Sequence, residues 1–188
     1  MNLLNLNTKF VGRNCIYHEI IDSTQKEAWR QVLNRVENGT LIFADEQKNG
    51  MGTHGRKWYT TEKESIAMSI VIYPNCNIKK LNNITIDIAE VLINVFRKLY
   101  SIELDIKKPN DIICNGKKLG GILTETKVFG EIVNALVIGI GFNLNQEIFK
   151  DEISNIATSI KKEFGFEVDR IKVISEVCNL LEKILIRL

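Results

Sequence analysis

The hydrophobic pattern at the start of the chain predicts a strand followed by a helix. Residues 15–21 (CIYHEII) are rich in β-branched and aromatic side chains, and apolar positions recur at helical spacing over residues 25–36. Asp22, Ser23 and Thr24 offer N-cap side chains for this helix, and Thr24 with Glu27 has the spacing of a capping box. The Asn-Gly pair at residues 38–39 is predicted to end it.

Two apolar runs with strand character follow, separated by a long polar stretch. Residues 40–45 (TLIFAD) and 65–73 (SIAMSIVIY) predict buried strands. Residues 46–64 between them carry three glycines, an arginine and a tryptophan. Long connections of this kind in compact domains are commonly functional, so we expect a binding site in this loop. Helical spacing of apolar residues over 84–99 then predicts a helix that lies on a sheet.

The second half of the chain is predicted to form a meander of short antiparallel strands. Residues 102–106, 111–114 and 118–126 have strand composition, and the Asn-Gly pair at residues 115–116 is a strong signal for a two-residue hairpin turn. A further apolar run ends in GIGFN at residues 139–143. The run continues to Asn145, and the Gly-x-Gly-x-Asn-x-Asn pattern of residues 139–145 predicts that this segment does not remain regular strand throughout.

Two amphipathic helices are predicted at the end of the chain. They cover residues 153–164 and 169–188, with Asp169 as the N-cap of the second. Strands and helices alternate along the chain, but the hairpin signals favour antiparallel pairing. The predicted fold class is therefore α+β, with a central mixed, mainly antiparallel sheet covered by helices.

Composition and charge are those of a globular protein without a large electrostatic footprint. The 188 residues include 25 basic and 23 acidic side chains, for a formal net charge of +2, and the mean hydropathy is −0.04. So small a net charge does not favour DNA or an anionic membrane as a partner. An anionic ligand would therefore have to be held by a local group of cations.

The sequence carries neither a targeting signal nor a cysteine motif for metal binding. The first ten residues lack a basic segment followed by a long apolar one, and no run of eighteen apolar residues occurs. This predicts a cytoplasmic protein. The cysteines form no CxxC pair, so we expect reduced thiols at Cys15, Cys76, Cys114 and Cys178.

Five short motifs occur in order along the chain, and together they are far more specific than any one of them. They are DSTQ (22–25), GMGTHGRKW (50–58), KKPND (107–111), KKLGGIL (117–123) and GIGFN (139–143). In this order and at these separations they resemble the catalytic domain of the biotin protein ligases, over roughly residues 14–188. The resemblance implies the fold shared by class II aminoacyl-tRNA synthetases and biotin ligases, which agrees with the α+β pattern.

The resemblance also implies a reaction in two steps. The carboxylate of biotin attacks the α-phosphate of ATP and pyrophosphate leaves; a lysine of a biotin carboxyl carrier protein domain, part of a biotin-dependent carboxylase, then takes biotin from the adenylate. ATP and biotin would be the substrates, with Mg²⁺ on the nucleotide. Because two anions must meet and the transferred phosphate gathers charge, fixed cations and N–H donors would lower the barrier.

Two cations in these motifs are the predicted catalytic residues. Lys118 matches the lysine of the family's lysine-leucine-glycine-glycine motif, which is expected to contact both the biotin carboxylate and the α-phosphate. Arg56 follows the glycines of the loop, where a guanidinium can fork onto phosphate oxygens. Taken alone, Lys118 would be interpreted as a solvated lysine at a strand edge, and the set of motifs favours its catalytic assignment.

The resemblance also implies the residues of two ligand sites. Neutral donors and acceptors suit the ureido ring of biotin, whereas cations, amides and an indole suit a nucleotide. The predicted biotin-binding residues are Ser23, Thr24, Gln25, Gln47, Gly50, Met51, Gly52, Thr53, Lys118, Gly120 and Gly121. The predicted ATP-binding residues are Arg56, Trp58, Lys107, Asn110, Asp111, Lys118 and Asn143, with Asp111 also as a metal ligand for Mg²⁺.

Several of these residues have a structural alternative. Ser23 and Thr24 would also serve as ordinary helix caps. Trp58 would also serve as a core anchor, and Asp111 as an acceptor for turn amides. The sequence leaves both roles open in each case.

The chain departs from the family pattern at three positions. Met51 and Thr53 stand where many members have arginine, which removes two positive charges from a loop thought to close over the adenylate. Two outcomes stay open: a looser loop would release the reactive adenylate, or other cations such as Lys48 or Lys57 would compensate. Our hypothesis is that Thr53→Arg slows the escape of the adenylate. Lys108 replaces the family's usual tryptophan.

The expected organisation is a single catalytic domain over residues 1–188, with neither an N-terminal DNA-binding domain nor a C-terminal small β-barrel domain. A ligase without repressor function is expected, and an exposed strand edge would pair with a partner or with a second copy in a homodimer. Two other functions stay open. One is a lipoate or octanoate ligase or transferase of the same fold, with Cys114 as a candidate nucleophile. The other is a biotin-binding protein that has lost catalysis.

Overall fold

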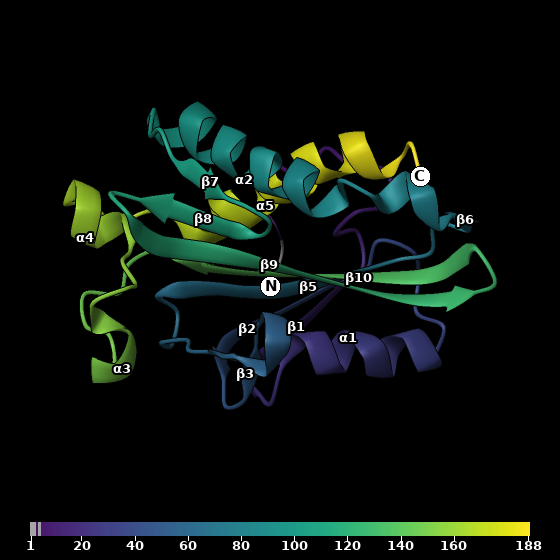
Figure 1. Cartoon of the computed structure of the whole chain (residues 1–188), viewed down its shortest axis with the longest axis horizontal. Helices are drawn as coiled ribbons and strands as arrows, with labels where there is room; N and C mark the ends of the chain where they lie inside the picture. The colour runs from purple at the N-terminus through teal and green to yellow at the C-terminus, as the bar shows by residue number, and fades with distance from the viewer. Residues whose placement is uncertain (1–2, 4) are drawn as a thin grey trace.

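The computed structural model describes residue 3 and residues 5–188 of the chain. Residues 1, 2 and 4, part of the segment in which no targeting signal was found, lie outside the described residues. The chain forms three layers, with a central sheet between two layers of helices (Figure 1). Helices α2 (Ile84–Tyr100) and α5 (Arg170–Leu185) cover one face of the sheet, and α1 (Thr24–Leu33) covers the other.

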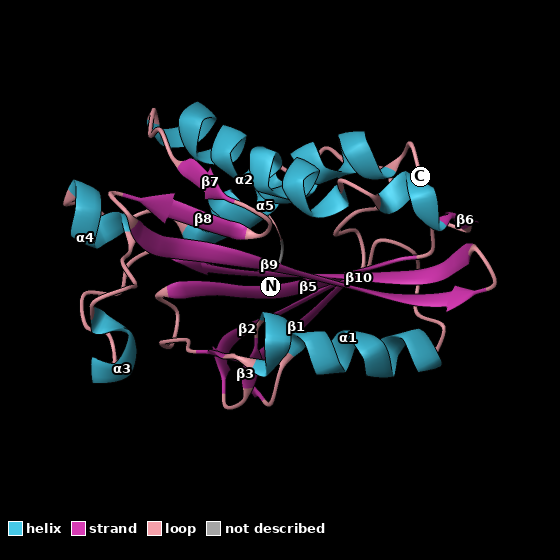
Figure 2. Ribbon diagram, viewed as in Figure 1, coloured by secondary structure: helices cyan, strands magenta, loops and turns pink. Residues whose placement is uncertain are grey.

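The central sheet is mixed and mainly antiparallel, as predicted (Figure 2). Its order is β1-β2-β5-β10-β9-β8-β7, with β6 paired to part of β10; β1 and β2 run parallel and the other neighbours antiparallel. The strands are β1 (Cys15–Ile21), β2 (Leu41–Gln47), β5 (Ser65–Ile72), β6 (Cys76–Asn77), β7 (Asp105–Lys107), β8 (Asp111–Cys114), β9 (Lys117–Phe129) and β10 (Ile132–Asn143).

The residue types and the turns of the central strands explain why these strands form. All eight residues of β5 are buried, because helices cover both faces of the sheet at this strand, and its sequence is correspondingly apolar without alternation. Between β8 and β9, Asn115 and Gly116 have φ of 49° and 76°. Two successive positive φ values are what a two-residue type I′ hairpin requires, so the predicted turn is confirmed.

Two hydrophobic clusters hold the layers together. The larger lies between the sheet and helices α2 and α5, and includes the stacked rings of Phe96 and Phe142, with centroids 4.5 Å apart. The smaller lies under α1 and consists of Ala28, Ile42, Val71 and Val137. Burial of apolar area on both faces of the sheet is the main stabilising contribution to the fold.

Helix α1 is capped by one of the three predicted N-cap residues, begins at Thr24 and ends sooner than predicted. Ser23, not Thr24, is its N-cap, and the Ser23 side chain accepts from the amide of Lys26. The Thr24 hydroxyl instead donates to Gln47 Oε1, 3.1 Å away. The helix ends at Leu33 rather than at residues 38–39, and turns lead from there to β2.

The long loop at residues 46–64 and the glycine segment of β10 are more regular than predicted. A small ribbon pairs β3 (Gly50–Met51) with β4 (Lys57–Trp58) across the 3₁₀ turn η1 (Thr53–Gly55). Strand β10 remains paired to β5 as far as Asn143. The prediction that residues 139–145 do not remain regular strand throughout is confirmed only for the end of this segment, because β10 stops at Asn143 and both glycines lie within the strand.

The predicted helix at residues 153–164 is two short helices, α3 (Asp151–Ser154) and α4 (Ile160–Phe164). The residues between them run beside β9. Lys118 N donates to the Ile156 carbonyl at 2.7 Å, and Thr158 N donates to the Lys118 carbonyl at 2.9 Å. This pairing replaces the backbone bonds that a continuous helix would make. Helix α5 is capped by Asp169 as predicted.

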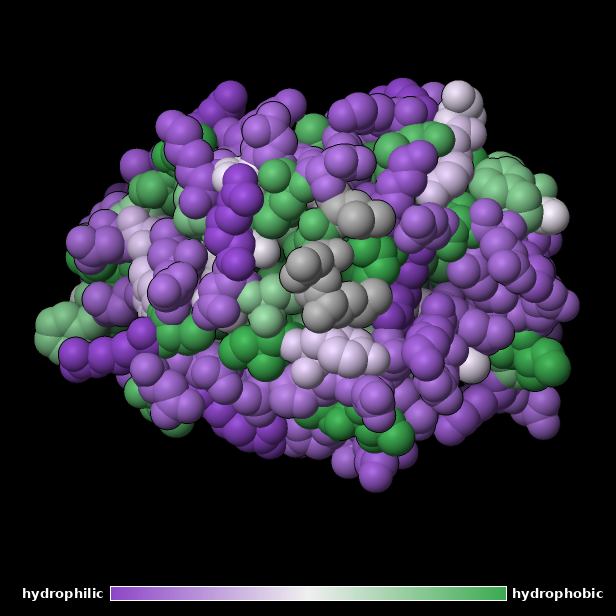
Figure 3. Space-filling model, turned by 180° about the vertical axis from the view of Figure 1, so that it is seen from behind, coloured by the Kyte–Doolittle hydropathy of each residue, from purple (hydrophilic) through white to green (hydrophobic). Residues whose placement is uncertain are grey.

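The strand predicted at residues 102–106 begins only at Asp105, because Ile102 and Leu104 turn into the hydrophobic core. All four cysteines are free thiols, as predicted, and three of them are buried. Among the described residues, no helix is both long enough and apolar enough to cross a membrane. Seen from behind, the surface is mainly hydrophilic, with hydrophobic side chains in separate groups (Figure 3).

Candidate functional site

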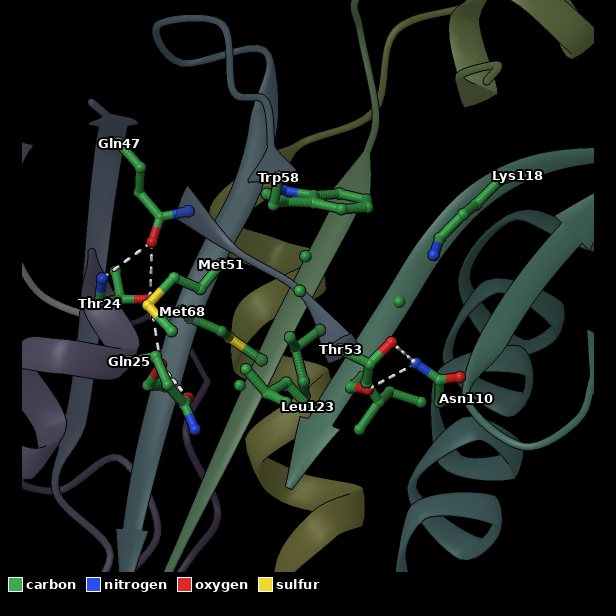
Figure 4. A pocket seen from close by; sticks show the side chains of 17 residues that line it. Thr24, Gln25, Gln47, Met51, Thr53, Trp58, Met68, Asn110, Lys118 and Leu123 are labelled. Atoms are coloured by element: carbon green, nitrogen blue, oxygen red, sulfur yellow. Dashed lines mark hydrogen bonds between the residues drawn. The ribbon is translucent and has the colours of Figure 1, made fainter. Parts of the chain in front are cut away.

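Two adjoining cavities lie where the β3–β4 ribbon passes over β9 and β10. The residues that line both are Gly52, Thr53, Trp58 and Lys118. Figure 4 shows Gln47, Thr24 and Gln25 grouped at one end of the first cavity, Lys118 and Asn110 at the other, and Trp58 between them. Most of the predicted site residues are thus brought together from segments that lie far apart in the sequence.

Neutral polar groups and apolar walls line the first cavity. Its polar lining residues are Thr24, Gln25, Gln47, Ser69 and Asn110, beside Lys118 at the boundary. Its apolar walls are Met51, Trp58, Met68, Ile122, Leu123 and Ile140. Such a mixture, mostly apolar with a few converging polar groups, is typical of small-molecule sites.

The polar end of this cavity is one continuous hydrogen-bonded network (Figure 4). Gln47 Oε1 accepts from Thr24 N at 2.8 Å, and so links the end of β2 to the start of α1. The Ser69 hydroxyl lies 3.0 Å from both Thr24 Oγ1 and Gln25 Oε1. These side chains are held in place before any ligand arrives, so the network is preorganised.

The second cavity is larger, about 620 Å³, and is rich in charge. Its cations are Arg56, Lys57, Lys107 and Lys118, and its carboxylates are Asp111 and Glu152. An excess of cations in a partly enclosed cavity raises the local concentration of anions. The small net charge of the chain implied that an anionic ligand must be held by a local group of cations, and the second cavity contains such a group.

Lys118 lies at the boundary of the two cavities. Its Nζ is 2.5 Å from Asp111 Oδ1 and 5.8 Å from the centroid of the Trp58 ring, and its side chain is 29% exposed. A Cβ on Gly121 would lie 3.3 Å from Lys118 Nζ, so the missing side chain of this glycine leaves space for the lysine. The backbone N–H and carbonyl of Lys118 are both hydrogen-bonded, to Ile156 and Thr158, and these bonds fix the position of its backbone at the cavity boundary.

Thr53 connects the glycine loop to the rest of the site. Its Oγ1 accepts from Arg56 Nη2 at 2.9 Å and lies 3.5 Å from Asn110 Nδ2, whose stronger bond goes to the Ile122 carbonyl at 3.1 Å. Arg56 is otherwise exposed and lines the second cavity. Its guanidinium therefore remains free to meet an anion, while Thr53 restricts its direction.

A contact between Tyr59 and the α3 segment closes the far side of the second cavity. Lys150 Nζ lies 4.3 Å from the centroid of the Tyr59 ring. A hydrogen bond to Glu152 raises the pKa of Tyr59, with smaller contributions from burial and from the Glu152 charge. The loop after β4 and the segment after β10 thus meet at the second cavity, which Tyr59 and Glu152 both line.

Three predicted biotin-binding residues do not line either cavity among the described residues: Ser23, Gly50 and Gly120. Ser23 is fully buried and caps α1, which is the structural alternative stated for it. A Cβ on Gly50 would lie 2.3 Å from the Trp58 carbonyl, and one on Gly120 would lie 2.5 Å from the Phe142 ring. The geometry gives Ser23 a capping role and the two glycines packing roles, and contact of these three residues with biotin stays a prediction.

Several residues that line the first cavity were not among the predicted site residues: Met68, Ser69, Ile122, Leu123, Gly139, Ile140 and Gly141. They lie on β5, β9 and β10, where the apolar pattern indicates only a buried strand. Two signals pointed to the site. Ser69 is a polar residue inside an otherwise apolar run, and the glycines of the GIGFN motif make room beside Gln25 and Trp58.

The described residues contain no group of three or more histidine, cysteine, aspartate or glutamate side chains that could hold a metal ion. The Asp111 carboxylate, the predicted ligand, is paired with Lys118. A Mg²⁺ ion commonly uses one or two carboxylates together with nucleotide phosphates. The site therefore fits a metal that arrives with a nucleotide, and does not fit one held by protein ligands alone.

Cys114 is unsuited to act as a nucleophile. It is 6% exposed and lines neither cavity among the described residues. Burial raises the pKa of its thiol, and the nearby charges of Glu163 and Asp105 raise it further. Because the thiolate is the reactive form, a raised pKa at a buried position disfavours acyl transfer through this cysteine.

Comparison with known proteins matches this fold and site to curated proteins and solved structures. Bifunctional ligase/repressor BirA of Bacillus subtilis is 38% identical over 180 residues, which cover 95% of this chain and 55% of that protein. The biotin--[acetyl-CoA-carboxylase] ligase of Mycobacterium tuberculosis is 27% identical over 149 residues, 77% of this chain and 53% of that protein. The chain thus spans about half the length of these curated relatives.

Among solved structures, the biotin protein ligase from Aquifex aeolicus in complex with biotin and ATP superposes with a TM-score of 0.79 at 29% identity, covering 93% of this chain and 71% of that one. The model of the biotin/lipoate A/B protein ligase family matches residues 17–143, which include every residue that lines the first cavity. On these grounds the chain belongs to the biotin/lipoate A/B protein ligase family.

Proposed function

We propose that this chain is a biotin protein ligase that activates biotin with ATP and transfers it to a lysine of a biotin carboxyl carrier protein domain. A carboxylate oxygen of biotin would bond to the α-phosphorus, and pyrophosphate would leave with the bonding electrons. The amine of the acceptor lysine would then attack the acyl carbon and lose a proton, and AMP would leave. Relatives and neighbours whose names or complexes state biotin and ATP support this reaction.

The observation that carries the proposal is the place of Lys118 between two chemically different cavities. One side of it has neutral polar groups and apolar walls, and the other has cations. A cation at the boundary can neutralise both a carboxylate from the first cavity and a phosphate from the second. To do so, Lys118 must exchange part of its contact with Asp111 for the substrates.

The first cavity suits the head group of biotin better than that of lipoate. The ureido ring carries N–H donors and a carbonyl acceptor, which match the amide and hydroxyl groups of Gln25, Gln47 and Thr24. The dithiolane ring of lipoate offers neither, so it would leave these groups without partners. The lipoate alternative is therefore disfavoured by the polar end of the cavity.

The first cavity is narrow, about 40 Å³, and must widen to admit a ring of this size. Met51 lines it and is 38% exposed. A methionine is unbranched and adopts several rotamers at little cost. We propose that Met51 moves aside when biotin enters and covers it afterwards, at a position where many family members have arginine.

The second cavity would take the nucleotide. Arg56, Lys57 and Lys107 would face its phosphates, and the Trp58 ring offers a flat surface for an adenine. Asp111 and Asn143 would be the oxygen ligands nearest to a Mg²⁺ ion carried by the phosphates. Bound there, the metal would supply further positive charge beside the transferred phosphate.

The test is exchange of labelled pyrophosphate into ATP, measured with biotin and, separately, with lipoate. Exchange that depends on biotin and not on lipoate is the expected result. Exchange with lipoate alone would show that the chain is a lipoate ligase and not a biotin ligase. No exchange with either acid, with biotin still bound in a calorimetric titration, would instead support a binding protein without catalysis.

A further inference from the structure

Glu125 lies behind the polar end of the first cavity and is hydrogen-bonded to the network there. It is on β9, opposite Val137 of β10, and is half-buried under α1. Its Oε2 accepts from Gln25 Nε2 at 2.9 Å and from Trp29 Nε1 at 2.7 Å. Within the described part of the chain it makes no salt bridge, so this carboxylate faces two neutral donors and no cation.

The Gln25 amide would have two orientations without Glu125. Its other partner is the Ser69 hydroxyl, 3.0 Å from Oε1, and a hydroxyl can donate or accept. An ionised carboxylate only accepts, so it requires the Nε2 end of the amide to turn toward β9. The indole of Trp29 only donates, and it therefore reinforces the role of Glu125 as an acceptor.

We propose that Glu125 is a positioning residue that makes the polar end of the first cavity accept hydrogen bonds, and so selects ligands that donate N–H groups there. With Nε2 engaged by Glu125, Gln25 presents its carbonyl oxygen toward the cavity. Gly139 is part of the same arrangement, because a Cβ there would lie 2.5 Å from Gln25 Oε1. Glu125 itself lines neither cavity among the described residues, so it acts through Gln25.

The inference rests on the proposed function, in that the N–H groups would be those of the biotin ring. It goes further because it names the group that decides the direction of hydrogen bonding. If Gln25 could turn over, its amide hydrogens would meet the ring N–H groups, and two donors would face each other. Such a mismatch leaves buried donors unpaired, which weakens binding by about tenfold or more.

The first experiment measures a ratio of affinities by calorimetry. The ligands are biotin and its cyclic carbamate analogues, in which oxygen replaces one ring N–H. The proteins are the wild type, Trp29→Phe, Trp29→Phe/Glu125→Leu and Glu125→Gln. The Trp29→Phe change is made together with Glu125→Leu so that no indole N–H is left unpaired, and Trp29→Phe alone is the matched control.

The wild type is expected to prefer biotin over at least one analogue, and Trp29→Phe and Glu125→Gln should keep that preference within about twofold, because an amide oxygen at position 125 can still accept. In Trp29→Phe/Glu125→Leu the preference should fall by about fivefold or more. An unchanged preference in this variant, even with weaker binding overall, would overturn the inference and leave the proposed function intact. A wild type that does not bind biotin would overturn both.

A second experiment exchanges the two side chains and does not depend on a leucine at position 125. Gln25→Glu places two carboxylates against each other, and biotin binding should weaken by about tenfold or more. In Gln25→Glu/Glu125→Gln, the new amide at position 125 can accept from Trp29 and donate to the carboxylate introduced at position 25. That carboxylate again turns an acceptor toward Ser69. Recovery of most of the lost affinity is expected, and absence of recovery would overturn the inference.

Discussion

Gly121, Gly139 and Gly141 each leave space that a side chain of the site occupies. Lys118 lies against Gly121, Gln25 against Gly139, and the Trp58 ring against Gly141. At the scale of single residues, the site therefore depends on missing Cβ atoms as much as on charged groups. None of these three glycines has a positive φ, so they are needed for space and not for backbone conformation.

Gly141→Ala should displace the Trp58 indole. A Cβ at this position would lie 2.4 Å from Trp58 Cε2, a distance that forces the ring to move. We expect ATP to bind at least about tenfold more weakly, measured by titration with the indole fluorescence of Trp58 in a Trp29→Phe background. Gly130→Ala is the control: it has open space around it at the hairpin tip, so it should cost stability through its φ of 61° and leave ATP affinity unchanged.

Thr53→Arg should slow the escape of the adenylate, because it returns a positive charge to the loop beside the second cavity. The variant also loses the hydroxyl that accepts from Arg56 Nη2. Thr53→Ala separates the two effects, since it removes the hydroxyl without adding charge. The rate of adenylate release is measured by rapid filtration after a single turnover. Equal release rates for the wild type and Thr53→Arg would contradict the hypothesis.

At the scale of elements, strands and helices were predictable where local pattern and long-range contacts agree. The strand at Cys15–Ile21 and the hairpin turn at Asn115-Gly116 depend on near neighbours, and both predictions are confirmed. The helix predicted over residues 153–164 fails because its middle pairs with Lys118, a contact that no local pattern encodes. The same limit explains why the site residues on β5, a uniformly buried strand, were missed.

A buried ion pair joins the start of α5 to the end of β2. Arg170 Nη2 donates to Asp45 Oδ1, and the Tyr17 hydroxyl donates to Asp45 Oδ2 at 2.5 Å. Asp45 is 2% exposed and lies two residues before Gln47, so this contact also fixes one edge of the site. Hydrogen bonding to Asp45 raises the pKa of Tyr17 to about 12, with burial as a smaller cause.

Arg170→Leu should lower the free energy of unfolding by roughly 3 to 5 kcal/mol, because it leaves the buried Asp45 carboxylate with only the exposed Lys63, 4.0 Å away, as a cation. Urea unfolding at neutral pH measures the change. Arg97→Leu is the matched control, since Arg97 pairs with an exposed Glu103, and its effect should stay below about 1 kcal/mol. Similar effects of the two substitutions would contradict the role of the buried pair.

At the scale of the whole molecule, the first residues of the described chain are tied to its last helix. The Glu182 carboxylate accepts from Lys9 N at 2.6 Å, Phe10 N at 2.9 Å and Val11 N at 3.0 Å. Burial alone would raise the pKa of Glu182, but these three amide donors outweigh it, and the pKa is lowered. A carboxylate with a lowered pKa in the folded state stabilises that state when it is ionised.

This predicts a pH dependence of stability with a definite sign. The contribution of Glu182 should be fully present above pH 4.5, the ordinary glutamate value, and be lost as the pH falls through its lowered pKa in the folded protein. Glu182→Gln should cost about 1.5 to 3 kcal/mol at pH 7, and the difference should shrink in acid. Urea unfolding of both proteins from pH 7 downward checks this; a difference independent of pH would contradict it.

The sequence could predict which residues belong to the site, but not how they are arranged in space. The ordered motifs and the family resemblance that they carry indicated Lys118, Arg56, Gln47 and their neighbours, and the structure brings most of these to two adjoining cavities. The ion pair of Lys118 with Asp111 and the network behind Gln25 depend on how strands pair, so the sequence could not predict them. The single-domain organisation over residues 1–188 stays a prediction.

The central claim is that Lys118 joins a biotin site to a nucleotide site, and biotin-dependent exchange of pyrophosphate into ATP tests it most directly. The wild type is compared with Lys118→Ala and with Lys117→Ala, which removes the neighbouring lysine of β9 that lines neither cavity among the described residues. We predict exchange in the wild type and in Lys117→Ala, and its loss in Lys118→Ala. Equal exchange in Lys118→Ala and the wild type would contradict the assignment.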